Sequence, residues 1–405
     1  MNRGFYIILA AQFFSALADN ALLFAAIALL MEISAPDWHV PLLQQFFIIS
    51  YILLAPFVGS FADSMPKGRV MLISNFIKLT GCLAMLAGMP PLYAYAIVGL
   101  GAAAYSPAKY GILTEYLPPS QLVEANGWME GATVAAIVLG AVLGGLMISP
   151  VLAGAALRDW GLDAWLGVPQ FAISIIVVLY LVAAWFNLHI PVVAIDHRPP
   201  RKNPVFLVYN FWHLFKLLWK DPLGQVSLAV TTLFWGVGAT LRLVVLSWAA
   251  FNMKFGLTEA TQLTAVVAVG IAIGSAIAGK WVQLENSVKV LPAGIVLGLT
   301  VISMIFVNDW RVAAGLLLFI GALAGYFVVP LNALLQHRGH LLMGAGHSIA
   351  IQNFNENIGI LILLGAYAFM VGHGVHIHWI IVSFGLFISL AMTVIWRRHR
   401  GDQVH

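Results

Sequence analysis

The chain has 405 residues, of which 61% are hydrophobic and 9% are charged, whereas soluble proteins average roughly 45–50% and about 25%. Too few polar residues are present to cover a soluble fold of this size, so the composition indicates a protein of the lipid bilayer. The net charge of +4 comes from basic residues dispersed along the chain, a pattern that excludes a nucleic-acid-binding protein.

Apolar stretches long enough to cross a membrane recur from one end of the chain to the other. A helix needs about 20 apolar residues to cross the hydrocarbon core. The runs are continuous and do not alternate, which favours helices over the strands of a barrel. The sequence therefore predicts an all-α integral membrane protein with twelve transmembrane helices. The predicted spans are 4–32, 40–62, 69–88, 91–115, 120–148, 166–189, 224–250, 257–282, 287–307, 311–336, 343–371 and 375–396.

Lysine and arginine are unequally divided between the two sets of loops. The set that includes both termini holds Arg3, Lys67, Arg69, Arg198, Arg201, Lys202, Lys216, Lys220, Lys280, Lys289, Arg338, Arg397, Arg398 and Arg400. The opposite set holds only Arg158, Lys254 and Arg311. Because basic loops stay on the cytoplasmic side, the sequence predicts a multi-pass protein with both termini in the cytoplasm.

The longest stretch outside the predicted spans divides the chain into six helices plus six. We predict an N-terminal six-helix bundle at 1–190, a cytoplasmic linker at 191–221, and a C-terminal six-helix bundle with a basic tail at 222–405. Within the linker, Val205–Lys220 is predicted to form an amphipathic helix. This helix either lies on the inner leaflet or serves only as a tether.

The two halves show weak similarities that keep the same order. Two pseudo-symmetric six-helix bundles are typical of the major facilitator fold, and this is the fold that the sequence predicts. The corresponding positions are Phe14–Ala16 with Phe234–Gly236, Gly59 and Ser60 with Gly274 and Ser275, and Pro107 with Pro330.

Ionisable residues inside the predicted spans are the first candidates for function. Each costs about 2.5–3.5 kcal/mol at the centre of a membrane helix, so they require partners, a water-filled cavity or both. Substrate or gating roles are predicted for four of them, whereas the other two, Lys78 and Glu130, could simply pair with each other. The four are Asp19, Lys109, Arg242 and Glu356.

The loop between the second and third spans resembles a loop motif of the major facilitator superfamily. Its candidate structural and gating residues are Gly59, Asp63, Lys67 and Arg69. Gly59 would permit close helix contact, Asp63 could cap a helix or form a salt bridge across the halves, and the two basic residues would face anionic lipid. Ser64 stands where an arginine is usual.

Whole segments of the chain resemble the bacterial lysophospholipid transporters, a family of the major facilitator superfamily in the Gram-negative inner membrane. These segments run from the first predicted helix to the eleventh and contain four of the six buried charges. They are 11–24, 51–59, 101–113, 234–242, 327–336 and 352–357.

The resemblance implies a flippase that moves lysophosphatidylethanolamine and lysophosphatidylglycerol from the outer to the inner leaflet of the inner membrane. An acyltransferase on the cytoplasmic face, which is also an acyl-acyl-carrier-protein synthetase, would then re-acylate them. The protein is expected to act as a monomer among membrane lipids. The substrate-binding residues implied are Asp19, Asn20, Tyr105, Lys109, Arg242, Asn332 and Glu356.

The charged residues suit this chemistry without any covalent step. A phosphodiester suits Arg242 or Lys109, with bidentate geometry favouring arginine, and an ethanolamine ammonium suits Asp19 or Glu356. The sequence shows no nucleophile–base pair and no clustered metal ligands, and its single cysteine is Cys82. We therefore predict a transporter, not an enzyme, without cofactor or metal.

Other functions are open at this point. A proton-coupled exporter of amphipathic drugs or metabolites could use Asp19 or Glu356 as the proton carrier. An intramembrane acyl-transferring enzyme would need a nucleophile beside His337, His340 or His347, and none accompanies them. A scaffold for the acyltransferase would have no reason to keep six buried charges.

Overall fold

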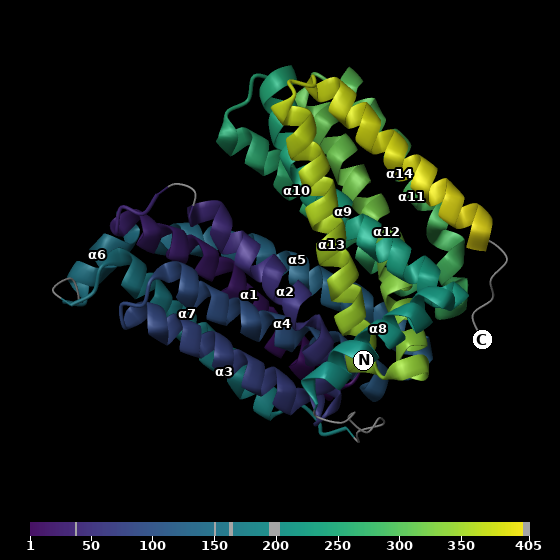
Figure 1. The fold of residues 1–405 in the computed structure, drawn as a ribbon. Coiled ribbons are helices and arrows are strands. Elements are labelled where there is room, and N and C mark those ends of the chain that lie inside the picture. The colour runs from purple at the N-terminus through teal and green to yellow at the C-terminus, as the bar shows by residue number, and fades with distance from the viewer. Residues whose placement is uncertain (37–38, 150, 162–164, 194–202, 400–405) are drawn as a thin grey trace. The chain divides into compact units, whose positions relative to one another are not determined.

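The computed structural model describes residues 1–36, 39–149, 151–161, 165–193 and 203–399. All regular secondary structure in these ranges is helical (Figure 1), so the predicted all-α class is confirmed. The linker run 197–202, with three of the basic residues counted above, lies outside the described residues, as does Arg400.

Helices occupy all twelve predicted spans. Eleven segments of the described chain are long and apolar enough to cross a membrane; α4 occupies the remaining span, and tyrosine, glycine and Lys109 lower its hydropathy. The helices are α1 (Arg3–Glu32), α2 (His39–Asp63), α3 (Lys67–Leu86), α4 (Pro91–Tyr116), α5 (Leu122–Met147), α7 (Val168–Leu188), α9 (Pro222–Asn252), α10 (Leu257–Trp281), α11 (Leu291–Ser303), α12 (Trp310–Met343), α13 (Ala345–Gly372) and α14 (Ile377–His399).

Shorter elements refine the predicted pattern. The ninth span is interrupted, because α11 is flanked by 3₁₀ segments at Leu284–Val290 and Met304–Phe306. A third 3₁₀ segment, Pro119–Gln121, precedes α5. The loop between the fifth and sixth spans contains a short helix, α6 (Leu152–Asp159), that the sequence analysis did not predict.

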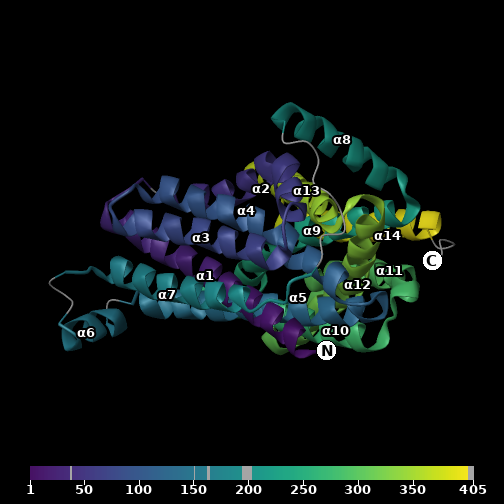
Figure 2. The same cartoon turned by 90° about the horizontal axis from the view of Figure 1, so that it is seen from below.

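The predicted linker helix is present as α8 (Pro204–Lys220), a separate helix in Figure 2. Its basic residues His213, Lys216 and Lys220 are exposed, as the amphipathic pattern requires. Its second half packs on α13, where the Trp219 indole donates a hydrogen bond of 3.2 Å to the Asn355 side chain. The placement of α8 on a leaflet remains a prediction.

The chain forms two compact units that do not follow the order of the sequence strictly. The first unit comprises Met1–Tyr116, Ala135–Phe211 and Gly344–Ala350. The second comprises Leu117–Val134, Trp212–Met343 and Ile351–His405. The first half of α5 therefore belongs to the second unit, and the first turn of α13 belongs to the first.

In the first unit, α3 packs against both α4 and α7, while α1 packs on α7 and α2 on α4. Small residues allow these helices to approach closely, as is usual in membrane bundles. Ala18, Ala21 and Ala25 of α1 are fully buried. A Cβ on Gly140 of α5 would come within 2.9 Å of the Leu17 carbonyl oxygen. This close packing fixes the face of α1 that carries Asp19.

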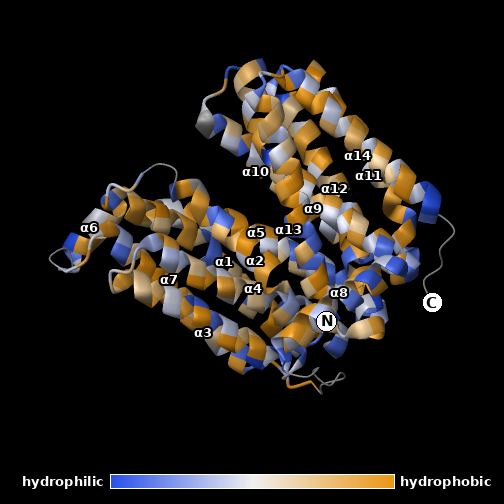
Figure 3. Ribbon diagram, viewed as in Figure 1, coloured by the Kyte–Doolittle hydropathy of each residue, from blue (hydrophilic) through white to orange (hydrophobic). Residues whose placement is uncertain are grey.

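In the second unit, α12 packs on α10 and α9, and α11 packs on α14. Glycines line the contact between α10 and α12, where a Cβ on Gly274 would overlap the backbone of Ala322. Hydrophobic residues run along the helices of both units (Figure 3). Many large ones are exposed, among them Leu53 and Leu390, as expected of surfaces whose solvent is lipid.

Candidate substrate site

A polar cluster in the first unit centres on Asp19. Ser15 and Asp19 lie four residues apart on one face of α1. The Lys78 ammonium of α3 donates hydrogen bonds to Asp19 Oδ2 at 2.7 Å and to Ser15 Oγ at 2.9 Å. The Tyr180 hydroxyl of α7 donates to Asp19 Oδ1 at 2.6 Å. Three helices therefore satisfy a charged pair that would be costly in an apolar interior.

The partner of Lys78 is Asp19, so the suggested pairing of Lys78 with Glu130 is wrong. Lys78 is only 1% exposed and forms its ion pair at 2.7 Å. The sequence could not reveal this pairing because it depends on which helices are neighbours. Here α3 and α1 both pack on α7, which brings the two charges together.

This cluster borders a cavity of about 80 Å³ within the first unit, several times the roughly 10–15 Å³ that one water requires. The structure brings three predicted site residues to its wall, namely Asp19, Tyr105 and Lys109. Asn20 is not part of that wall, and its amide instead donates to the Ala16 carbonyl at 2.8 Å. The remaining lining residues include Gln12, Ser15, Tyr51, Lys78 and Ser106.

A second polar cluster, in the second unit, joins the predicted residues Glu356 and Asn332. The Gln352 amide donates to Glu356 Oε1 at 2.7 Å and to Asn332 Oδ1 at 2.8 Å. Glu356 is 8% exposed, and Glu130 of α5 lies close enough for the two carboxyl charges to interact. The structure thus joins two of the predicted site residues, Glu356 and Asn332, in one network through Gln352.

Within the second unit, Arg242 is not part of the polar cluster around Glu356. Arg242 lies on α9 with an exposed side chain, and it makes no hydrogen bond or ion pair with the described residues. Its guanidinium is therefore available to a ligand, although nothing in the structure orients it.

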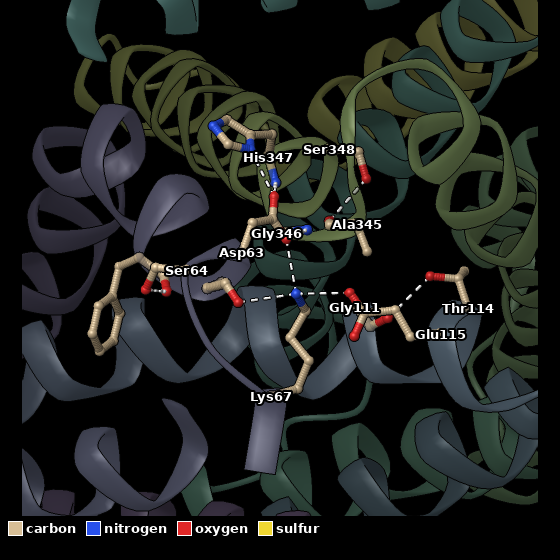
Figure 4. A network of polar contacts seen from close by, with 12 residues as sticks. Asp63, Ser64, Lys67, Gly111, Thr114, Glu115, Ala345, Gly346, His347 and Ser348 are labelled. Atoms are coloured by element: carbon tan, nitrogen blue, oxygen red, sulfur yellow. Dashed lines mark hydrogen bonds and ion pairs between the residues drawn. The ribbon is translucent and has the colours of Figure 1, made fainter. Parts of the chain in front are cut away.

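The loop motif between α2 and α3 forms a third network, shown in Figure 4. Asp63 accepts hydrogen bonds from the backbone N–H groups of Gly346 and His347, at 2.8 and 3.1 Å. The His347 ring nitrogen Nδ1 lies 2.6 Å from the same carboxylate. Asp63 thus caps the N-terminus of α13, which confirms one of its expected roles.

Lys67 completes this network, and its predicted position facing lipid is wrong. Its ammonium is 2.8 Å from both Asp63 and Glu115, and the residue is only 3% exposed. Arg69, by contrast, is exposed. Gly59 makes the expected close contact, since a Cβ there would lie 2.9 Å from the His347 Cα atom.

Several residues of these clusters were missed or undervalued in the sequence. Gln352 and Glu356, like Ser15 and Asp19, are four residues apart, a spacing that could have identified them. Lys78 and Asp19 are the only charged residues in the interior of their predicted spans, whose ends hold Arg69 and Glu32, and this was a weaker signal. Tyr180 and Glu115 gave no signal, because their roles depend on packing between distant helices.

Membrane-length helices with charged side chains gathered around a small cavity are typical of a transporter. The chain matches the Major Facilitator Superfamily over residues 8–364. It therefore belongs to this superfamily of membrane transporters, and within it to the family whose curated members carry the name lysophospholipid transporter.

Relatives in this family match almost the whole chain. The lysophospholipid transporter LplT of Yersinia enterocolitica is 44% identical over 93% of this chain and 89% of its own length. The protein of the same name from Enterobacter sp. (strain 638) is 43% identical over 98% of this chain and 96% of its own.

Solved structures of transporters share the fold at low sequence identity. The transporter FucP in its outward conformation matches with a TM-score of 0.77 at 13% identity, covering 99% of both chains. A bacterial homologue of the iron transporter ferroportin matches with a TM-score of 0.71 at 16% identity, covering 98% of this chain and 100% of its own.

Proposed function

We propose that this protein moves lysophospholipids across the membrane. The observation that carries the proposal is the charged cavity of the first unit, where Asp19, Lys78 and Lys109 form part of the wall. A cavity of this kind suits a charged headgroup, while the single acyl chain can stay against apolar helix surfaces or lipid. The names of relatives at 43–45% identity support the same substrate class.

The substrates are lysophosphatidylethanolamine and lysophosphatidylglycerol. Lys109 and Arg242 attract the phosphodiester, and Glu356, close to Glu130, attracts the ammonium of the ethanolamine lipid. Asp19 is less suited to the ammonium, because Lys78 and Tyr180 already donate to its two oxygens. Tyr105 and Asn332 contribute hydrogen bonds, and Asn20 supports the adjoining face of α1. The Asp63 network serves as a gate or brace.

Movement runs from the outer to the inner leaflet of the cell inner membrane, and both termini are cytoplasmic. An acyltransferase and acyl-acyl-carrier-protein synthetase on the cytoplasmic face consumes the product, which keeps the inner-leaflet concentration of lysolipid low. Consumption then sets the direction without an obligatory ion gradient. The protein works as a monomer.

Reconstitution of the purified protein into vesicles tests this function. Labelled lysolipid placed in the outer leaflet should become protected from an impermeant quencher, without any ion gradient and faster than in protein-free vesicles. A strict requirement for a proton or sodium gradient would contradict the proposal and favour the exporter of amphipathic compounds.

A further inference from the structure

Both carboxylate oxygens of Asp19 already accept a strong hydrogen bond. Oδ2 accepts from Lys78 at 2.7 Å, and Oδ1 accepts from Tyr180 at 2.6 Å. The negative charge of Asp19 is therefore balanced inside the protein by a lysine that is 1% exposed. A ligand ammonium approaching Asp19 would also meet the positive charge of Lys78.

Lys78 retains one N–H donor that is not hydrogen-bonded to any oxygen or nitrogen of the described residues. A lysine ammonium has three N–H donors. Asp19 and Ser15 accept two of them, and no other residue of the described chain accepts the third. The ammonium also lies 4.6 Å from the centre of the Tyr105 ring, and both side chains border the cavity.

Charge and hydrogen bonding at the cavity wall favour an anion. Its charged lining residues are two basic ones, Lys78 and Lys109, and the acidic Asp19. A phosphodiester carries one negative charge and accepts hydrogen bonds through its oxygens. The Tyr105 hydroxyl is buried beside Ser15 but makes no hydrogen bond of good geometry in the described chain, so it can donate to such an oxygen.

We infer that Lys78, together with Lys109 and Tyr105, binds the phosphodiester shared by both lysolipids, and that Asp19 is a positioning residue that holds Lys78 at the cavity. The inference rests on the proposed function and deepens it. If Lys78 binds the phosphodiester, the affinity of the first-unit cavity should not depend on whether ethanolamine or glycerol follows the phosphate. Loss of Asp19 should then impair the glycerol lipid as strongly as the ethanolamine lipid.

The test is equilibrium binding to purified protein in nanodiscs. The probes are lysophosphatidylethanolamine, lysophosphatidylglycerol and monooleoylglycerol, which has one acyl chain and no phosphate. Lys78→Met should weaken binding of both lysophospholipids at least tenfold and leave monooleoylglycerol unchanged. Asp19→Asn should weaken both to a similar degree, and Asp19→Glu should restore part of the loss. Lys254→Met, which removes an exposed lysine of the α9–α10 loop, is the matched control and should bind as wild type.

A second variant keeps the inference testable if Lys78→Met fails to fold. Tyr105→Phe retains the ring and removes only the hydroxyl, so it should cause a loss of a few fold that is confined to the two phosphate-containing lipids. Equal weakening of monooleoylglycerol would show a packing role and overturn the inference. Wild-type affinity of both Lys78→Met and Tyr105→Phe for the two lysophospholipids would also overturn the inference.

The remaining outcomes separate this inference from the proposed function. Loss restricted to the ethanolamine lipid in Asp19→Asn would make Asp19 an ammonium-binding residue and overturn the inference alone. A wild-type protein that moves neither lysolipid in vesicles would overturn the proposed function, and the inference with it.

Discussion

Asp63 shows how one side chain can serve two structural tasks. Its carboxylate caps the first turn of α13 through two backbone N–H groups, and it also forms an ion pair with the buried Lys67. An asparagine has a single acceptor oxygen, so it could keep one of the two cap hydrogen bonds but not the charge pair. The two tasks can therefore be separated by substitution.

Asp63→Ala should lower the thermal unfolding midpoint of the solubilised protein more than Asp63→Asn does. Breaking a buried ion pair costs about 3–5 kcal/mol, although Glu115 remains beside Lys67 and reduces that cost. Loss of the cap adds about 1 kcal/mol. Ser64→Ala, at the neighbouring position, serves as the control. Identical midpoints for Asp63→Ala and Ser64→Ala would contradict the assigned role.

Single residues were predictable where chemistry alone selected them. Asp19, Lys109 and Glu356 stood out because ionisable groups are rare inside membrane spans, and the structure places each in a polar cluster or at the cavity wall. The partner of Lys78 and the burial of Lys67 were not predictable, since both depend on residues far away in the sequence. The exposure of Arg242 likewise follows from the packing of α9, not from its charge.

At the scale of helices, length and hydropathy predicted where each span lies but not how the helices pack. Of the 3₁₀ segments around α11, Met304–Phe306 is as apolar as the helix, so composition did not reveal that interruption. The other, Leu284–Val290, contains Glu285, Ser287 and Lys289 and begins before the predicted span. The contact between α10 and α12 depends on glycines, whose positions acquire meaning only once the two helices are known to be neighbours.

Gly274→Ala should lower the thermal unfolding midpoint, because its Cβ would overlap the backbone of Ala322 on α12. Overpacking of this kind costs typically about 1–3 kcal/mol. Gly315→Ala on α12 is the matched control, because no atom lies within 4 Å of its added Cβ, and its midpoint should stay the same or rise slightly. Equal midpoints for the two variants would show that α10 and α12 do not pack as described.

For the whole molecule, the uneven distribution of basic loops predicts the topology, and this can be measured directly. In a Cys82→Ala background, Lys254→Cys should react with an impermeant maleimide added to intact spheroplasts. Arg398→Cys should react only after the membrane is permeabilised, because the basic tail is predicted to be cytoplasmic. Labelling of Arg398→Cys from outside would contradict the predicted orientation.

The most direct test of the whole account compares one-chain and two-chain lipids in the same reconstituted vesicles. Each buried CH₂ is worth about 0.8 kcal/mol, so a second acyl chain that must leave the bilayer adds a large barrier. Initial rates of leaflet exchange should therefore be far higher for lysophosphatidylethanolamine than for diacyl phosphatidylethanolamine. Lys78→Met should reduce the lysolipid rate toward that of protein-free vesicles. Equal rates for the two lipids, or an unchanged rate in Lys78→Met, would contradict the proposal that this protein transports lysolipids and binds their headgroup at the first-unit cavity.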